Sequence, residues 1–248
     1  MTKDLFSDQS HYYARYRPGY PPELFHHILQ FVQERKHAWD CATGNGQAAS
    51  VLADFFDRVD ATDLSAQQLS HAVHKPNIFY HQCPAEKTPF PDNTFDLVTV
   101  ATAYHWLDWQ AFHREATRTG KNGCVVAVWS YNLHHCQDTE VDRIIRHFYH
   151  DITAPYWDYA RKHVDEEYRN VAFDFDPLPA RRFEFQVNWR RDELLGYLSS
   201  WSAVQSYIRA NGFSPLDLID EELRAAWNET DVLTFTFPLF LRIGRVRK

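Results

Sequence analysis

The chain has 248 residues and a formal net charge of −7, which disfavours a broad nucleic-acid-binding surface because such a surface normally needs a basic face. Hydrophobic residues make up 44% and charged residues 24%, as in ordinary globular proteins. No stretch approaches the ~20 apolar residues of a membrane span, and the N-terminus lacks the apolar segment of a signal peptide. We therefore expect a cytoplasmic protein that binds neither nucleic acid nor membrane.

Cysteine and histidine patterns bear on metal binding. The four cysteines, at positions 41, 83, 124 and 136, show no Cys-x-x-Cys spacing, and we expect reduced, mostly buried thiols. The densest histidine group is His134-His135-Cys136, but adjacent residues of an extended segment point to opposite faces. Since no second pair at ligand spacing lies nearby, we expect no metal site.

The chain begins with a polar and aromatic segment. Its end, Arg17-Pro18-Gly19-Tyr20-Pro21-Pro22, prevents continuous helix, and we expect an arm that folds over a pocket. Pro22 can then open a helix that continues through Glu34, where apolar residues recur at an approximately helical period.

The middle of the chain alternates between strand-like and helix-like segments. Such alternation predicts a parallel sheet with helices on both faces, and it places ligands at the carboxyl ends of the strands. The expected strands are residues 37–41, 58–63, 77–82, 95–101 and 123–131, and the expected helices are residues 47–56, 65–74 and 109–119.

The second half is less regular. We expect helices near residues 138–150, 156–169, 191–211 and 216–228, a strand at 182–189 and a final strand at 232–242, with Pro238 at an edge or bulge. With no repeat or clear linker, the chain is expected to form a single domain. Its parts would be an N-terminal arm and helix (1–35), a cofactor-binding core (36–132), a substrate cap with an edge strand (133–230) and a final strand (231–248).

The most informative motif is Asp40-Cys41-Ala42-Thr43-Gly44-Asn45-Gly46-Gln47, between the first expected strand and its helix. A dinucleotide fits this spacing, because Gly44, Gly46 and Ala49 match Gly-x-Gly-x-x-Gly/Ala and Asp63 lies near the distance of a ribose-binding acid. Asp40, however, would repel a pyrophosphate and suit a ligand with ammonium and sulfonium groups. S-adenosylmethionine has both cations and no phosphate, and the motif therefore favours it over NAD(P).

Further motifs extend this pattern into a family resemblance. Asp40-x-Ala42-x-Gly44-x-Gly46, Asp63 and the run from Pro84 to Val98 together resemble the class I S-adenosylmethionine-dependent methyltransferases. Ala103-Tyr104-His105-Trp106-Leu107-Asp108-Trp109 and Tyr13-x-x-x-Arg17-Pro18-x-Tyr20-Pro21 are similar to the small-molecule branch that includes trans-aconitate methyltransferase. The resemblance covers roughly the first half of the chain. Ala42 departs from it by replacing the family's first glycine, and we expect a slightly tighter loop there.

The resemblance implies a Rossmann-like α/β methyltransferase fold: a doubly wound, mostly parallel seven-stranded sheet with helices on both faces and a helical cap. It also implies a set of cofactor contacts, in which Asp63 accepts the ribose hydroxyls and Ala85 and Glu86 flank the adenine. The expected cofactor-binding residues are Tyr13, Arg17, Asp40, Ala42, Gly44, Gly46, Gln47, Asp63, Leu64, Ala85, Glu86 and Thr102.

His105 and Trp106 follow the fourth strand and are the expected substrate-pocket residues, with His105 as the candidate catalytic residue. His105 would act either as a general base, for a hydroxyl or amine acceptor, or as a pocket residue. The aromatic stretches 156–159 and 201–207 are candidates for pocket walls or for simple helix packing. We expect O-methylation of a small molecule, with a carboxylate as one candidate acceptor. The alternatives are an NAD(P)-dependent oxidoreductase and a non-catalytic S-adenosylmethionine-binding protein.

Overall fold

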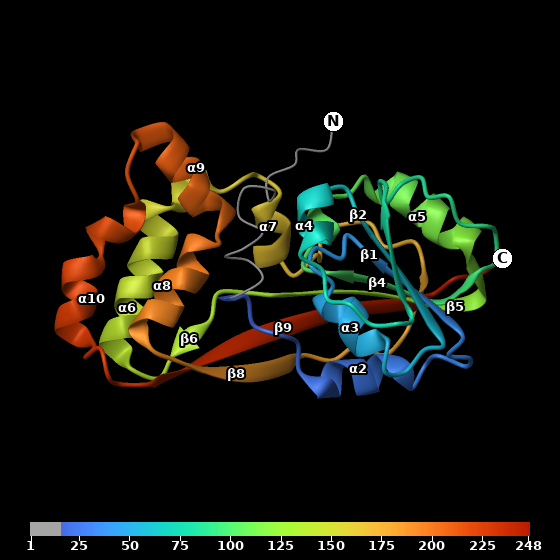
Figure 1. Cartoon of the computed structure of the whole chain (residues 1–248), viewed down its shortest axis with the longest axis horizontal. Helices are drawn as coiled ribbons and strands as arrows, with labels where there is room; N and C mark the ends of the chain where they lie inside the picture. Colours follow the sequence, from blue (N-terminus) through green and yellow to red (C-terminus); the bar gives the residue numbers. More distant parts are fainter. Residues whose placement is uncertain (1–15) are drawn as a thin grey trace.

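A computed structural model describes residues 16–248, and its centre is one mixed β-sheet. Neighbouring strands follow the order β3-β2-β1-β4-β5-β9-β6, and β7 and β8 also pair with β9 (Figure 1). The first five strands are parallel and β9 runs antiparallel to β5, so the expected mostly parallel sheet is confirmed. The strands are β1 (His37–Cys41), β2 (Arg58–Asp63), β3 (Ile78–Gln82), β4 (Phe95–Ala101), β5 (Gly120–Tyr131), β6 (His135–Cys136), β7 (Asp176–Pro177), β8 (Phe183–Trp189) and β9 (Leu233–Arg245).

Helices cover both faces of the parallel part of the sheet. Alternate residues of β5 point to opposite faces: Val125 and Ala127 belong to one buried cluster, whereas Val126 and Val128 belong to another. The first cluster includes buried residues of α2 (Pro22–Leu29) and α3 (Gln47–Leu52), and the second includes those of α5 (Trp109–Thr119). This arrangement confirms the doubly wound architecture. The short helix α4 (Ala66–Ser70) follows β2, and the Ser65 side chain caps it by accepting the Gln68 amide.

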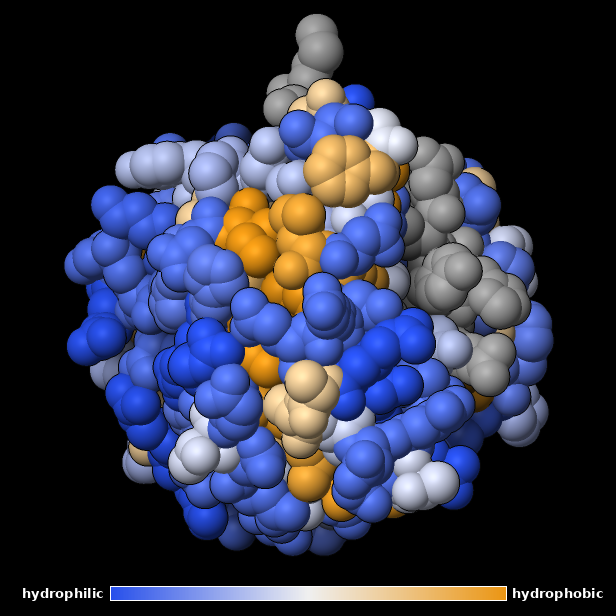
Figure 2. All heavy atoms as spheres, turned by 90° about the vertical axis from the view of Figure 1, so that its left-hand side faces the viewer, coloured by the Kyte–Doolittle hydropathy of each residue, from blue (hydrophilic) through white to orange (hydrophobic). Residues whose placement is uncertain are grey.

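Most of the helices after β5 form a cap beyond one end of the parallel strands, joined to the core by the long strand β9 (Figure 1). The face of the cap seen in Figure 2 is mainly hydrophilic, with apolar atoms gathered near its centre. The helices of this half are α6 (Thr139–His147), α7 (Arg161–Asp165), α8 (Arg191–Ser199), α9 (Ser202–Asn211) and α10 (Asp220–Ala226).

Two helices and one proline of this half differ from the sequence expectations. The helix expected at 156–169 is reduced to α7, and the backbone at Glu167 and Tyr168 has φ of 55°, which no α-helix contains. The helix expected at 191–211 is broken into α8 and α9, because Trp201 is extended and its indole packs into the cap core. Pro238 is not on an edge strand. It lies in β9 and pairs with Glu184 of β8, at the point where the strand on the opposite side of β9 changes from β5 to β6.

Two further observations concern membranes and metals. Within residues 16–248, no helix is long and apolar enough to cross a membrane. In the same part of the chain, no group of three or more His, Cys, Asp and Glu side chains is arranged to hold a metal ion. The thiols of Cys41, Cys124 and Cys136 are buried and that of Cys83 is half-buried; none forms a disulfide.

Candidate active site

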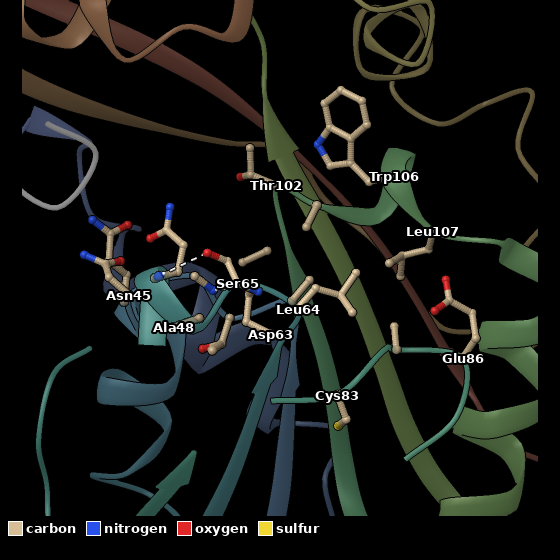
Figure 3. A pocket seen from close by; sticks show the side chains of 18 of the residues that line it. Asn45, Ala48, Asp63, Leu64, Ser65, Cys83, Glu86, Thr102, Trp106 and Leu107 are labelled. Carbon is tan, nitrogen blue, oxygen red and sulfur yellow. Dashed lines mark hydrogen bonds between the residues drawn. The ribbon is translucent and has the colours of Figure 1, made fainter. Parts of the chain in front are cut away.

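Two adjoining pockets lie at the carboxyl ends of the parallel strands. The larger, which we call the strand-end cleft, has about 1020 Å³ of empty space, a volume that includes space open to solvent (Figure 3). In this view Asn45 and Ala48 lie on one side, Leu107 and Glu86 lie on the other, and Asp63 and Leu64 lie between them. Its lining residues are Tyr20, Ala42, Thr43, Gly44, Asn45, Gln47, Ala48, Asp63, Leu64, Ser65, Gln68, Cys83, Ala85, Glu86, Ala101, Thr102, Ala103, Trp106 and Leu107.

The loop between β1 and α3 takes the left-handed backbone conformation at three positions: Ala42, Gly44 and Gly46 have φ of 52°, 58° and 83°. Gly46 is required for a second reason, since a Cβ at this position would overlap the Tyr80 hydroxyl. Ala42 and Gly44 line the cleft as expected, whereas Gly46 lies behind it and shapes the loop. Ala42 holds a conformation that favours glycine, which accounts for the family's usual residue there.

Asp63 ends β2 and lines the cleft, as the sequence predicts. Both of its oxygens already bind the backbone: Oδ2 accepts the Gly44 amide at 2.8 Å and Oδ1 accepts the Ser65 amide at 2.9 Å. The same side chain therefore fixes the loop and places a carboxylate on the cleft, where ribose hydroxyls would find acceptors.

Asp40 differs from its expected role. It is fully buried beneath the glycine loop and does not line the cleft. Its carboxylate accepts the Thr43 hydroxyl at 2.5 Å, the Thr99 hydroxyl at 2.7 Å and the Ala49 amide at 3.1 Å, and burial raises its pKa to about 6. The sequence suggested a charge at the tip of the strand that meets the ligand. The structure instead shows an anchor that joins β1 to its loop, to α3 and to β4.

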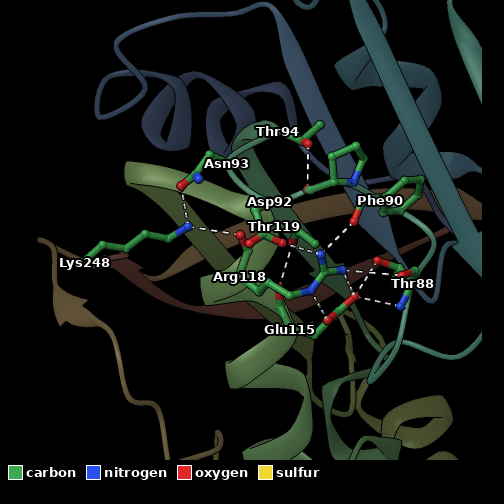
Figure 4. Close-up of polar contacts among 10 residues, drawn as sticks. Thr88, Phe90, Asp92, Asn93, Thr94, Glu115, Arg118, Thr119 and Lys248 are labelled. Carbon is green, nitrogen blue, oxygen red and sulfur yellow. Dashed lines mark hydrogen bonds and ion pairs between the residues drawn. The ribbon is translucent and has the colours of Figure 1, made fainter.

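The loop after β3 forms the wall opposite the glycine loop and brings Ala85 and Glu86 into the cleft. One oxygen of Glu86 accepts the Asp108 amide at 3.1 Å. Behind the wall, Glu115 of α5 accepts the amide and hydroxyl of Thr88 at 2.7 and 2.6 Å, and Arg118 binds the Phe90 carbonyl and the Asp92 carboxylate (Figure 4). Helix α5 therefore holds this loop in place through an ion-paired network.

Arg17 lies outside the strand-end cleft and lines the second pocket. Its guanidinium donates to the Tyr131 hydroxyl at 2.9 Å and to the hydroxyl and carbonyl of Ser200 at 2.9 and 3.2 Å, while its carbonyl accepts from the Gln47 side chain at 3.1 Å. This segment thus ties the core to the cap. Tyr13, the other expected arm residue, lies outside the described residues.

The second pocket, which we call the aromatic pocket, lies between the core and the cap and has about 610 Å³ of empty space, including space open to solvent. Thr102 and Trp106 line both pockets and therefore mark where they meet. Thr102 has φ of 55°, and its hydroxyl lies 3.0 Å from that of Tyr20. The pocket is lined by Arg17, Thr102, His105, Trp106, Tyr131, Asn132, Leu133, Tyr149, Trp157, Arg161, Tyr197, Trp201 and Ser202.

His105 lines the aromatic pocket and is largely buried in a single 3₁₀ turn, Tyr104–Trp106. Burial lowers the pKa of its imidazole well below 6.5, and the neighbouring Arg161 and His163 side chains add to this effect. The ring is therefore neutral at physiological pH.

Sequence reasoning missed several cap residues of this pocket. Arg161 and Tyr149 were not candidates, because both lie in segments expected to be plain helix. Trp157 and Trp201 were singled out only as members of aromatic stretches, and both line the pocket. One sequence signal could have indicated Arg161: it closely follows the aromatic run 156–159, and such a run is unusual on a solvent-exposed helix face.

Comparisons with known proteins decide the family. The model of the methyltransferase-domain family matches residues 39–128. A putative type II methyltransferase from Anaeromyxobacter dehalogenans is 38% identical, with a TM-score of 0.85 over 93% of this chain and 98% of that one. The chain belongs to the class I S-adenosylmethionine-dependent methyltransferases. A putative methyltransferase from Dictyostelium discoideum is 29% identical over 98% of this chain and 95% of its own length. A putative methyltransferase from Bacillus halodurans, 18% identical with a TM-score of 0.52, shares the fold.

The methyltransferase uses S-adenosylmethionine, and the strand-end cleft fits this cofactor. In this cleft Asp63 would face the ribose, and Leu64, Ala85 and Leu107 would supply apolar surface for a flat base. The NAD(P) oxidoreductase alternative is not favoured by these relatives. The narrower resemblance to the trans-aconitate branch stays a prediction.

Proposed function

We propose that this methyltransferase transfers the methyl group to an oxygen of a small anionic molecule, with a carboxylate as the acceptor. The observation that carries the proposal is the guanidinium of Arg161 in the pocket that adjoins the cofactor cleft, with the positive charge of Arg17 on the same pocket. Guanidinium groups recognise carboxylates with two parallel hydrogen bonds, and they are weakly hydrated enough to serve in a partly buried site.

Arg161 is placed to receive an anion. Its Nε donates to the Tyr149 hydroxyl at 3.0 Å and to Asp165 at 3.2 Å. Its terminal nitrogens donate to no group within residues 16–248, although its side chain is only 18% exposed. A half-buried guanidinium with unused donors at a pocket wall favours an anionic ligand, because the ligand would satisfy these donors.

The aromatic walls do not favour a cationic acceptor. The Arg161 guanidinium lies 5.2 Å from the centroid of the Trp157 ring and 5.6 Å from that of Tyr149, and the Arg17 guanidinium lies 5.4 Å from that of Tyr197. These rings already face positive charges, so an ammonium group would meet repulsion where it needs a cation–π contact. An amine acceptor is disfavoured for this reason.

The two pockets would orient the cofactor and the acceptor relative to each other. When bound, S-adenosylmethionine supplies a methyl group activated by positive sulfur. Thr102 and Trp106 lie where the pockets meet, while Arg161 would hold the acceptor against this junction, with the charge of Arg17 on the same pocket. Alignment of two reactants can lower a barrier by ~7–11 kcal/mol, and an ionised carboxylate needs no base.

The test uses S-adenosylmethionine with a labelled methyl group and a panel of trans-aconitate, benzoate and other carboxylic acids, with phenol and ethanolamine as the alternatives. A carboxylate product is a methyl ester, and mild base releases its label as methanol, whereas an ether or a methylamine keeps it. We expect base-labile label that falls at least tenfold in Arg161→Gln and is unchanged in the exposed control Arg169→Gln. Base-stable label, or label on ethanolamine alone, would refute the proposal.

A further inference from the structure

Tyr168 is a buried tyrosine that contacts the pocket histidine from outside the pocket. It follows α7 in the chain, is fully buried, and lies with its ring nearly parallel to that of His105, at 29° and 6.2 Å between centroids. Its hydroxyl oxygen is 3.0 Å from Nδ1 of His105. The other ring nitrogen of His105 is Nε2. It does not belong to the fully buried side-chain atoms of residues 16–248 that lack a hydrogen-bond partner.

The direction of this hydrogen bond follows from the surroundings of the phenol. Burial raises the pKa of Tyr168, so the phenol keeps its proton. The hydroxyl lies within hydrogen-bond distance of Nδ1 of His105, while the Ser130 hydroxyl and the His105 backbone amide act on the phenol oxygen as donors, which opposes the effect of burial on its pKa. A buried O–H donates to the acceptor that is present, so Tyr168 donates to Nδ1. The single proton of the neutral imidazole is then on Nε2.

The backbone at Tyr168 adopts an unfavourable conformation. Both Glu167 and Tyr168 have φ of 55°, a conformation that is uncommon outside glycine and that persists where the surroundings enforce it. Arg242 of β9 supplies this constraint, since its Nη1 donates to the carbonyls of Tyr168 and Val171 at 2.5 and 2.7 Å.

We propose that Tyr168 is a positioning residue: it fixes His105 in the tautomer that carries its proton on Nε2, so that His105 donates a hydrogen bond to the acceptor and does not remove a proton from it. The inference rests on the proposed function for the identity of the aromatic pocket as the acceptor site. It also deepens that function, because a site whose histidine is a donor requires an acceptor that arrives ionised.

Charged groups around the ring favour the same state. The groups that face His105 are Arg161 and His163, both of which disfavour a second proton on the ring, and the phenol of Tyr168. An imidazole that stays neutral with Nε2–H can donate to a carboxylate held by Arg161, whereas a base would need an unprotonated Nε2.

The tautomer can be read without a substrate, by long-range ¹H–¹⁵N spectra of the full-length protein with ¹⁵N-histidine and bound S-adenosylhomocysteine. The His105 signals are assigned by their loss in His105→Gln. We expect Nδ1 as the unprotonated nitrogen and Nε2 as the protonated one from pH 6 to 8. A protonated Nδ1, a mixture of tautomers or an imidazolium would overturn the proposal.

Two perturbations then test the role of Tyr168. Tyr168→Phe removes the donor, and the Nδ1 signal should shift towards that of a mixture of tautomers. The matched control Ser130→Ala removes a hydroxyl that acts on the phenol as a donor, and it should leave the tautomer of His105 unchanged. If Tyr168→Phe does not fold, biosynthetic 3-fluorotyrosine makes the phenol a stronger donor and should move the Nδ1 signal of the otherwise native protein. An unmoved Nδ1 signal in either experiment, or a change of tautomer in Ser130→Ala, would overturn the proposal. These spectra do not depend on the acceptor, so failure of the methyl-transfer assay and failure of this inference are separable.

Discussion

Asp63 at the end of β2 accepts the Gly44 amide of the loop after β1 at 2.8 Å. The carboxylate that lines the cleft therefore also fixes the loop that faces it. We therefore expect both cofactor affinity and loop order to depend on this one side chain.

Asp63→Ala should lower the affinity for S-adenosylhomocysteine at least a hundredfold, because it removes the ribose acceptor and leaves the Gly44 and Ser65 amides without their partner. Isothermal titration calorimetry measures the affinity, and Asp57→Ala, an exposed aspartate, is the control. Unchanged affinity in Asp63→Ala would mean that the ribose binds elsewhere.

The buried carboxylate of Asp40 should make stability depend on pH. Its pKa is raised from 3.8 to about 6, so the folded protein keeps a proton that the unfolded chain releases as the pH rises. Stability is therefore lost between about pH 4 and pH 6, by at most about 3 kcal/mol. Asp40→Asn can still accept the Ala49 amide but has no charge to bury.

Urea denaturation from pH 4.5 to 7.5 tests this effect. We expect the free energy of unfolding of Asp40→Asn, relative to the wild type, to rise with pH and then level off above pH 7. The exposed substitution Asp217→Asn should show no such trend. A flat difference for Asp40→Asn would contradict the assignment of a raised pKa.

His134 is a fully buried histidine whose two ring nitrogens have no hydrogen-bond partner within residues 16–248. Its ring stacks on Phe237, and burial lowers its pKa to about 3. As the pH falls below 6.5, His134 binds a proton in the unfolded chain but not in the folded protein. The free energy of unfolding therefore falls by about 1.4 kcal/mol for each pH unit.

His134→Phe should stabilise the protein, because it replaces unpartnered polar atoms by an apolar ring of similar shape. We expect a gain of about 1–3 kcal/mol at pH 7.5 and a larger gain at pH 5, measured by urea denaturation. His74→Phe, at an exposed position, is the matched control. A gain that does not grow as the pH falls would show that His134 is hydrogen-bonded or charged in the folded protein.

Arg118→Ala should loosen the loop that carries Ala85 and Glu86, since Arg118 joins this loop to Glu115 (Figure 4). We expect a loss of roughly 2 kcal/mol of stability and a several-fold weaker binding of S-adenosylhomocysteine. Arg114→Ala changes an exposed residue of the same helix and should alter neither quantity. A loss of stability without any change in affinity would show that the network supports the fold and not the cleft.

The sequence by itself determined the cofactor half of the molecule. The glycine spacing after β1, the acid that ends β2 and the alternation of strands and helices are local signals within a short stretch of chain. In a parallel sheet, moreover, the ends of consecutive strands meet at one edge. Most of the expected contacts line the cleft for this reason. Asp40 was misplaced because the sequence gives the charge of a side chain and not its burial.

Only the tertiary structure decided the acceptor half. Arg161 and Tyr168 lie in a segment with a helical pattern, and their roles arise from packing between the core and a cap joined to it by β9. Arg242 holds Tyr168 across 74 positions of sequence, and the backbone at Tyr168 adopts a conformation that its own sequence disfavours. Such placement depends on the sum of distant contacts, and no local pattern encodes it.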